Sequence, residues 1–265
     1  MRVSIRVKIL GIFAATLIIT SVLNLTGLAQ AEENKLGVTF DLTYMSKWMT
    51  KGKEGYGQQG AFFETIDIDL WGTGFGTAVT HQSATASGYV DKQRFNYKLY
   101  YGGNLFDGEP YKINYKVNWI YKHYYGRARS KGDTQEWEFV FSWPDILPIE
   151  NLVPKYIAHY EYPAGSNYDN RAITGWVHRF GLSYELSIPE LTEPLNLSAE
   201  IAYRDGLGGG SVDHDWSHAT LGGSTKFKIT KNLSFVPGLY HQISMDDSVC
   251  KRDVTYCKLS MKYRF

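Results

Sequence analysis

His81 and Ser83 are the pair of residues whose types and spacing come nearest to catalytic chemistry. Residues two apart on a β-strand point to the same side, so the imidazole can take the proton of the serine hydroxyl, and the serine can then attack an acyl ester. Asp91 or Gln93 would be available to orient the imidazole. A lipid-acyl hydrolase is therefore one hypothesis. Its alternative is that both residues belong to a strand with no catalytic role.

Charged residues that alternate with apolar ones form a second candidate site. If the apolar side chains face lipid, the charged ones line the interior of a barrel, where Lys258 or Lys262 of the last strand is expected to pair with Asp41 of the first. Such an interior is either filled by ion pairs or is a narrow aqueous channel between acidic and basic walls. Both alternatives remain open from the sequence. The expected pore-lining residues are Asp41, Asp67, Asp69, Lys98, Lys112, Lys116, Glu136, Glu138, Lys258 and Lys262.

Strands, not helices, must position these residues, because apolar and polar side chains alternate with a period of two along most of the chain. The clearest segment is 111–121, in which six aromatic or aliphatic residues at every second position alternate with Lys112, Asn114, Lys116 and Asn118. A helical period of 3.6 would mix the two sets. The lengths of these segments are close to the roughly 9 to 11 residues that a tilted membrane strand needs. The sequence therefore predicts an all-β fold, namely an antiparallel transmembrane β-barrel of about 12 strands. The expected strands are 38–49, 62–71, 75–83, 94–101, 111–121, 136–143, 155–162, 176–186, 195–204, 219–229, 233–244 and 254–265.

The first 31 residues have the three parts of a secretory signal peptide. Arg2, Arg6 and Lys8 precede an apolar run over 9–23, and Ala29-Gln30-Ala31 matches a cleavage site. We therefore expect a signal peptide over 1–31 and a single barrel domain over 32–265. Cleavage removes three positive charges and lowers the formal net charge from +1 to −2, which gives no reason to expect a nucleic-acid partner.

The two cysteines, Cys250 and Cys257, lie beside the last expected strand of an exported chain. A disulfide is one possibility, and two free thiols with mismatched side-chain directions are the other. The spacing does not match a zinc-type pair, so the sequence predicts no metal site and no cofactor.

Connections between the expected strands alternate in length. The longer, polar ones include the glycine-containing segment 50–61, while 72–74 and 230–232 are tight turns. Since bacterial barrels keep short turns in the periplasm, this alternation places both chain ends there. The proline-rich segment after Trp143 is expected to form a compact turn. Trp48, Trp71 and Trp137 at strand ends would suit the aromatic girdles of a membrane barrel.

Three stretches resemble known outer-membrane proteins. The end of the chain, YCKLSMKYRF, resembles the closing-strand signal that the barrel-assembly machinery of Gram-negative bacteria reads, with Phe265 as its last residue. The opening stretch, FDLTYMSKWMTKGKEGYGQQGAFFETIDIDLWGTGFG, resembles a group of uncharacterised, porin-like outer-membrane β-barrels. The spacing of His81 and Ser83 is similar to that in outer-membrane phospholipases and lipid A deacylases, although Ala84-Thr85 stands where the phospholipases have Asn-Gly.

These observations predict an exported protein of the bacterial outer membrane whose partners are outer-membrane lipid, the assembly machinery and small polar solutes. The expected function is a passive, porin-like channel. A lipid-acyl hydrolase using His81 and Ser83 and a plugged barrel with a structural or surface role are the alternatives.

Overall fold

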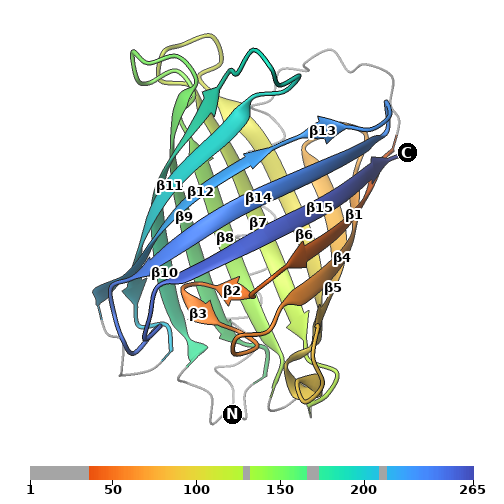
Figure 1. The fold of residues 1–265 in the computed structure, drawn as a ribbon, viewed down its shortest axis with the longest axis vertical. Coiled ribbons are helices and arrows are strands. Elements are labelled where there is room, and N and C mark those ends of the chain that lie inside the picture. Colours follow the sequence, from red (N-terminus) through yellow and green to blue (C-terminus); the bar gives the residue numbers. More distant parts are fainter. Residues whose placement is uncertain (1–35, 128–131, 166–172, 209–213) are drawn as a thin grey trace, which may run out of the picture. The chain divides into compact units, whose positions relative to one another are not determined.

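Residues 36–265 form one compact unit in a computed structural model, which describes residues 36–127, 132–165, 173–208 and 214–265. The predicted signal peptide lies outside the described residues. Twelve long strands pair in sequence order as antiparallel neighbours, and β15 returns to pair with β1, so that the sheet closes into a barrel (Figure 1). The predicted fold is thereby confirmed. The long strands are β1 (Gly37–Met45), β4 (Ala61–Asp69), β5 (Phe75–Ala84), β6 (Arg94–Leu105), β7 (Ile113–His123), β8 (Thr134–Ser142), β9 (Leu152–Pro163), β10 (Gly175–Leu186), β11 (Leu195–Asp205), β12 (Asp215–Thr225), β14 (Leu233–Ser244) and β15 (Val254–Arg264).

Most strand boundaries lie within a few residues of those predicted from alternation, and the largest difference is at β12. The sequence predicts a strand over 219–229, whereas β12 spans Asp215–Thr225. Its pairing explains the shift, because β11 begins at Leu195 directly opposite Thr225 and offers no partner beyond that point. The short strand β13 (Phe227–Lys228) follows and pairs with β14. Residues 144–150, between β8 and β9, form turns and bends, as predicted.

The barrel is apolar outside and polar inside. In most of the long strands, outward side chains are exposed although they are large and hydrophobic, while buried side chains are mostly polar or charged. This arrangement follows from strand geometry, since alternate residues point to opposite faces of a closed sheet. Among the described residues, no helix is long and apolar enough to cross a membrane. The exposed band includes Phe40, Leu42, Phe62, Ile66, Val79, Tyr97, Leu99, Trp137, Phe180, Leu182, Leu197, Leu221, Leu239, Ile243, Leu259, Met261 and Tyr263.

The connection after β1 differs from the polar loop that the sequence predicts. It contains a short hairpin of β2 (Met49–Thr50) and β3 (Lys53–Glu54), which we call the mouth hairpin (Figure 1). Lys51 and Gly52 have φ values of 48° and 86°, the positive values of a type I′ turn, whose twist suits a two-residue hairpin. A β-carbon on Gly52 would also overlap the His218 ring and Val249, so only glycine lets the turn approach the barrel wall this closely.

Candidate functional site

The tip of the mouth hairpin is bound inside the barrel by a ring of four charged side chains. Lys51 forms ion pairs with Glu136 of β8 and with Glu161 of β9, the latter with 2.5 Å between Nζ and Oε2. Lys122 of β7 also pairs with both carboxylates, Glu136 and Glu161, the latter at 3.0 Å. We call these four residues the charge ring. Its two cations and two anions alternate, and each carboxylate is satisfied by two ammonium groups, which offsets the cost of burying them.

The backbone of the mouth hairpin is held from the opposite side of the barrel. Arg204 of β11 donates Nη2–H to the carbonyl of Lys51 (2.5 Å), and Gln242 of β14 donates Nε2–H to the carbonyl of Gly52 (2.9 Å). Arg252 forms a bidentate pair with Glu54 through Nε and Nη2. The hairpin therefore spans the lumen from β7–β9 on one side to β11 and β14 on the other.

The residues that flank the hairpin pack inward as well. Trp48 and Tyr56 stack with ring centroids 4.5 Å apart and are 7% and 0% exposed. The Arg94 guanidinium lies 5.3 Å from the Trp48 ring, and Gln82 Nε2 donates to the Tyr56 hydroxyl (3.0 Å). Burial raises the pKa of the Tyr56 phenol, which keeps it neutral as it donates to the carbonyl of Lys92. Trp48 is thus inside the barrel, and its predicted place in an aromatic girdle is wrong.

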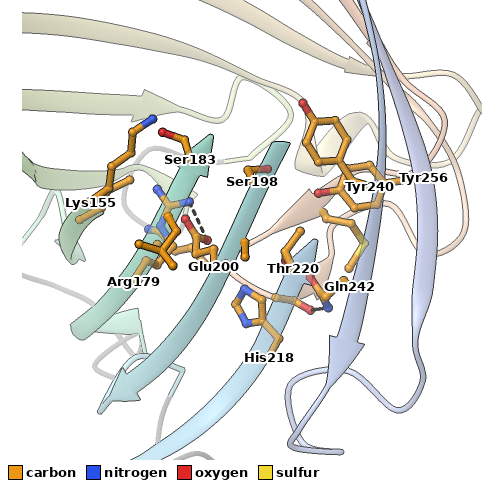
Figure 2. A pocket seen from close by; sticks show the side chains of 17 residues that line it. Lys155, Arg179, Ser183, Ser198, Glu200, His218, Thr220, Tyr240, Gln242 and Tyr256 are labelled. Atoms are coloured by element: carbon orange, nitrogen blue, oxygen red, sulfur yellow. Dashed lines mark hydrogen bonds and ion pairs between the residues drawn. The ribbon is translucent and has the colours of Figure 1, made fainter. Parts of the chain in front are cut away.

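The hairpin divides the lumen at this end into two cavities, each of about 330 Å³. The cavity on the side of the loops, which we call the mouth cavity, is lined by residues of the hairpin and of the adjacent strand ends. The other, the inner cavity, lies between the hairpin and the walls formed by β9–β12, β14 and β15 (Figure 2). Among the described residues, Lys51 is the one that lines both, so it lies at the boundary between them.

Charged and aromatic groups face each other across the inner cavity. Arg179 of β10 pairs with Glu200 of β11 (3.3 Å), and Lys155 of β9 is exposed on the same wall (Figure 2). Opposite them lie Tyr240 and Tyr256, whose ring planes are within 16° of parallel and whose centroids are 5.4 Å apart. The inner cavity thus presents positively and negatively charged side chains beside an aromatic surface.

Glu136, Glu138 and His159 bring their ligand atoms within 4.8 Å of one another, a geometry compatible with a metal ion. The hydrogen bonds of these three residues favour a hydrogen-bonded network over a metal site. Arg179 Nη2 donates to His159 Nε2 (2.8 Å), so the proton of the neutral ring is on Nδ1, which donates to Glu136 (2.7 Å). A metal would need the Nδ1 lone pair and the carboxylate that Lys51 and Lys122 already hold. The group is better explained as a hydrogen-bonded network.

Most residues predicted to line the pore do lie on the inner wall. Asp41 pairs with Lys262 (3.4 Å), which confirms the expected contact between the first and last strands. Asp67 accepts a hydrogen bond from the Tyr100 hydroxyl (2.7 Å) and lies 3.8 Å from Lys98.

The other predicted pore residues differ in their surroundings. The ammonium of Lys116 lies 3.7 Å from the centre of the Tyr100 ring. Asp69 ends β4 and accepts a hydrogen bond from the Gly72 amide in the following turn (2.9 Å). Lys112 precedes β7 and pairs with Asp107 in the connection after β6 (2.6 Å), so it lies at the rim and not along the wall. Glu136, Glu138 and Lys258 point inward, Glu136 within the charge ring.

His81 and Ser83 lie on the outward side of β5, as predicted, with the buried Gln82 between them pointing inward. His81 Nδ1 contacts Glu64 (2.8 Å) and its Nε2 contacts the Tyr125 hydroxyl (3.3 Å), while Tyr125 donates its proton to Gln93. His81 thus has a carboxylate beside one ring nitrogen and a phenol beside the other. In the described residues no hydrogen bond joins His81 to Ser83, and Asp91, proposed to orient the ring, pairs with Arg127.

Cys250 and Cys257 are both free thiols, so of the two alternatives that the sequence left open the structure has the unbonded one. Cys257 lies in β15 opposite Leu239, which is 62% exposed on the outward face. Cys250 is buried in the connection after β14 and donates to the carbonyl of Arg252 (3.2 Å). The side chains thus point to different places, which was the alternative left open by the sequence.

Sequence reasoning missed Lys51, Lys122, Glu161 and Arg204. The last three lie on the polar face of strands that alternation predicts, so extending the alternation to the strand ends would have identified them as inward-facing. Lys51 carries no such signal, because it lies in a segment with the composition of an ordinary polar loop.

No protein-family model matches the chain, and no curated protein matches its sequence. Solved structures do match its shape. A KdgM porin has 10% sequence identity and a TM-score of 0.50, with 86% of this chain and 99% of that chain covered. The chain has the fold of bacterial outer-membrane β-barrels. A NanC porin has 8% identity and a TM-score of 0.49 over 87% and 100% of the two chains. The outer membrane phospholipase of Salmonella typhi has 17% identity and a TM-score of 0.45 over 85% and 90%. At these identities the likeness concerns the fold alone.

Proposed function

We propose that the protein is a channel of the outer membrane that lets small polar solutes pass through its lumen. The observation that carries this proposal is that inward-pointing charged side chains remain in contact with solvent. The side chain of Lys262 is 48% exposed, and those of Lys98 and Arg179 are 28% and 26% exposed. A filled interior would bury these groups, whereas a water-filled lumen solvates them.

The mouth hairpin closes this channel in the conformation described here. Its tip is held by the wall on both sides of the lumen, and Lys51 lines both the mouth cavity and the inner cavity. Both chain ends of the barrel lie at the other end, in the periplasm, so the hairpin faces the cell exterior. Passage therefore requires the hairpin to move away from the charge ring.

Single-channel recording of the mature protein in a planar bilayer tests the proposal. We expect discrete ohmic steps that are infrequent in the native protein, because the docked hairpin predominates. A folded, heat-modifiable barrel that never conducts, even when the hairpin is released by substitution, would contradict the channel and support the plugged, structural barrel.

A lipid-acyl hydrolase remains a second candidate because Glu64 holds His81 on the outward face, two residues from Ser83. The geometry weighs against it, since in the described residues no hydrogen bond joins His81 to Ser83 and both ring nitrogens have other partners. Ester hydrolysis by the folded protein in mixed micelles, compared between the native chain and Ser83→Ala, distinguishes the two. We expect no activity that depends on Ser83, and a loss of hydrolysis in Ser83→Ala with normal folding would establish the enzyme.

The proposal also includes recognition of the last strand by the barrel-assembly machinery. Phe265 is 74% exposed at the end of β15, where another protein can reach it. Deletion of Phe265 should lower the amount of folded protein in the outer membrane of cells while leaving refolding into detergent unchanged. Equal amounts in cells would contradict this role.

A further inference from the structure

The mouth cavity has a large excess of positive charge. It is lined by seven basic and two acidic side chains. Charges of one sign in a small, partly enclosed space repel each other and lose hydration, so they are stable together only when opposite charge is near. The basic side chains are Lys51, Lys53, Lys92, Arg94, Lys122, Arg127 and Arg204, and the acidic ones are Glu54 and Glu161.

The described residues neutralise only part of this charge. The charge ring balances Lys51 and Lys122, and Asp91 pairs with Arg127. Glu54 is already occupied by Arg252, which is not one of the lining cations. Among the described residues, no carboxylate forms an ion pair with any of the remaining four cations, Lys53, Lys92, Arg94 and Arg204.

Arg94 and Arg204 are the least expected of these, because both are buried, at 9% and 2% exposure. Arg94 donates to the Tyr124 hydroxyl (2.5 Å) and Arg204 to the carbonyls of Leu207 and Lys51, all uncharged acceptors. The Nε–H of each guanidinium has no acceptor among the described residues. These Nε atoms are themselves covered, so what the two side chains bring to the cavity that they line is positive charge without an ion pair in the described residues.

Lys53 and Arg204 also converge on one place. Lys53 Nζ lies 3.2 Å and Arg204 Nη1 lies 3.4 Å from the point where a β-carbon on Gly208 would stand. Burial, and then the nearby Arg204 guanidinium, lower the pKa of the Lys53 ammonium, although Asp246 acts in the opposite direction. Two cations from different parts of the chain are thus held together beside a residue without a side chain.

We propose that the mouth cavity binds a small multivalent oxyanion, whose oxygens accept hydrogen bonds from Arg94, Arg204 and Lys53. Planar guanidinium groups and an ammonium match phosphate and carboxylate oxygens in charge and in geometry. The cavity lies inside the barrel between the wall and the hairpin, so the anion comes from solution and not from a lipid headgroup. The site needs no open lumen, and its test is independent of conduction.

Isothermal titration calorimetry of the full mature barrel, folded in detergent, with sodium pyrophosphate tests this site. We expect saturable binding that weakens as sodium chloride is raised, because exposed charges are screened. Lys53→Met should weaken binding by about tenfold through the loss of one charge contact in a partly buried site. Lys53 is only partly buried and has no ion pair in the described residues, so the variant should still fold, which heat-modifiability on a gel verifies.

Lys231→Met is the matched control, since Lys231 is an exposed lysine in the turn before β14, at the other end of the barrel. It should bind pyrophosphate as the native protein does. Citrate in place of pyrophosphate shows whether carboxylates serve as well as phosphates, and binding of either one supports the site. A folded native barrel that binds neither anion, or equal weakening by Lys53→Met and Lys231→Met, would overturn the proposal.

Discussion

Removal of the Lys51 ammonium is the perturbation that most directly tests how the channel is closed. In Lys51→Met, Lys122 alone faces Glu136 and Glu161, which are 3% and 8% exposed. An uncompensated buried charge costs about 3 to 5 kcal/mol. The backbone hydrogen bonds that also hold the hairpin contribute about 0.5 to 1.5 kcal/mol each, and they are present in both proteins, so they cannot offset this loss.

The cost falls on the docked conformation, because water can enter and solvate the carboxylates only when the hairpin leaves. At 1.4 kcal/mol for each factor of ten, the equilibrium shifts toward the undocked hairpin by about 10² to 4 × 10³. Single-channel recording should therefore show a large rise in open probability with little change in the conductance of the open state, since the barrel wall is unchanged.

A second substitution separates charge from side-chain size. Lys51→Met combined with Glu161→Gln removes one charge of each sign from the charge ring, so Lys122 and Glu136 remain as a balanced pair. We expect an open probability between those of the native protein and Lys51→Met. If Lys51→Met conducts as rarely as the native protein, or if the double variant opens as often as the single one, the electrostatic explanation of closure is refuted.

Three further predictions concern other parts of the barrel. Lys116→Glu should shift ion selectivity toward cations, because Lys116 points into the lumen at Tyr100. The same change at Lys112, which lies on the rim, should shift selectivity much less. Equal shifts in the two variants would contradict these placements of the two lysines. Gly52→Ala should raise open probability, because alanine is strained at this positive φ and its β-carbon would overlap His218 and Val249. A variant with the open probability of the native protein would contradict the close approach of the hairpin turn to the barrel wall. Thiol titration of unreduced, denatured protein should find both Cys250 and Cys257 reactive, and a disulfide-linked peptide would contradict this.

The alternation of side chains was enough to predict much of this protein. The residues on the two faces of β15 follow from counting, and the pairing of Asp41 with Lys262 follows from closing the sheet. These features are local: each residue of a strand faces the lumen or the lipid according to its neighbours in the sequence, and closure makes the first and last strands adjacent. The fold and most of the pore wall were therefore accessible from the sequence.

The state of the lumen was decided only by the tertiary structure. Lys51 meets Glu161 across 110 positions of sequence, and Arg204 reaches the hairpin carbonyl across 153. The segment that carries Lys51 has the composition of any polar loop, and whether such a segment extends into solvent or folds inward depends on the charges that it meets on distant strands. The same reason explains the free cysteines and the partners of His81, since side-chain direction and the residues of neighbouring strands, and not spacing along the chain, determine both.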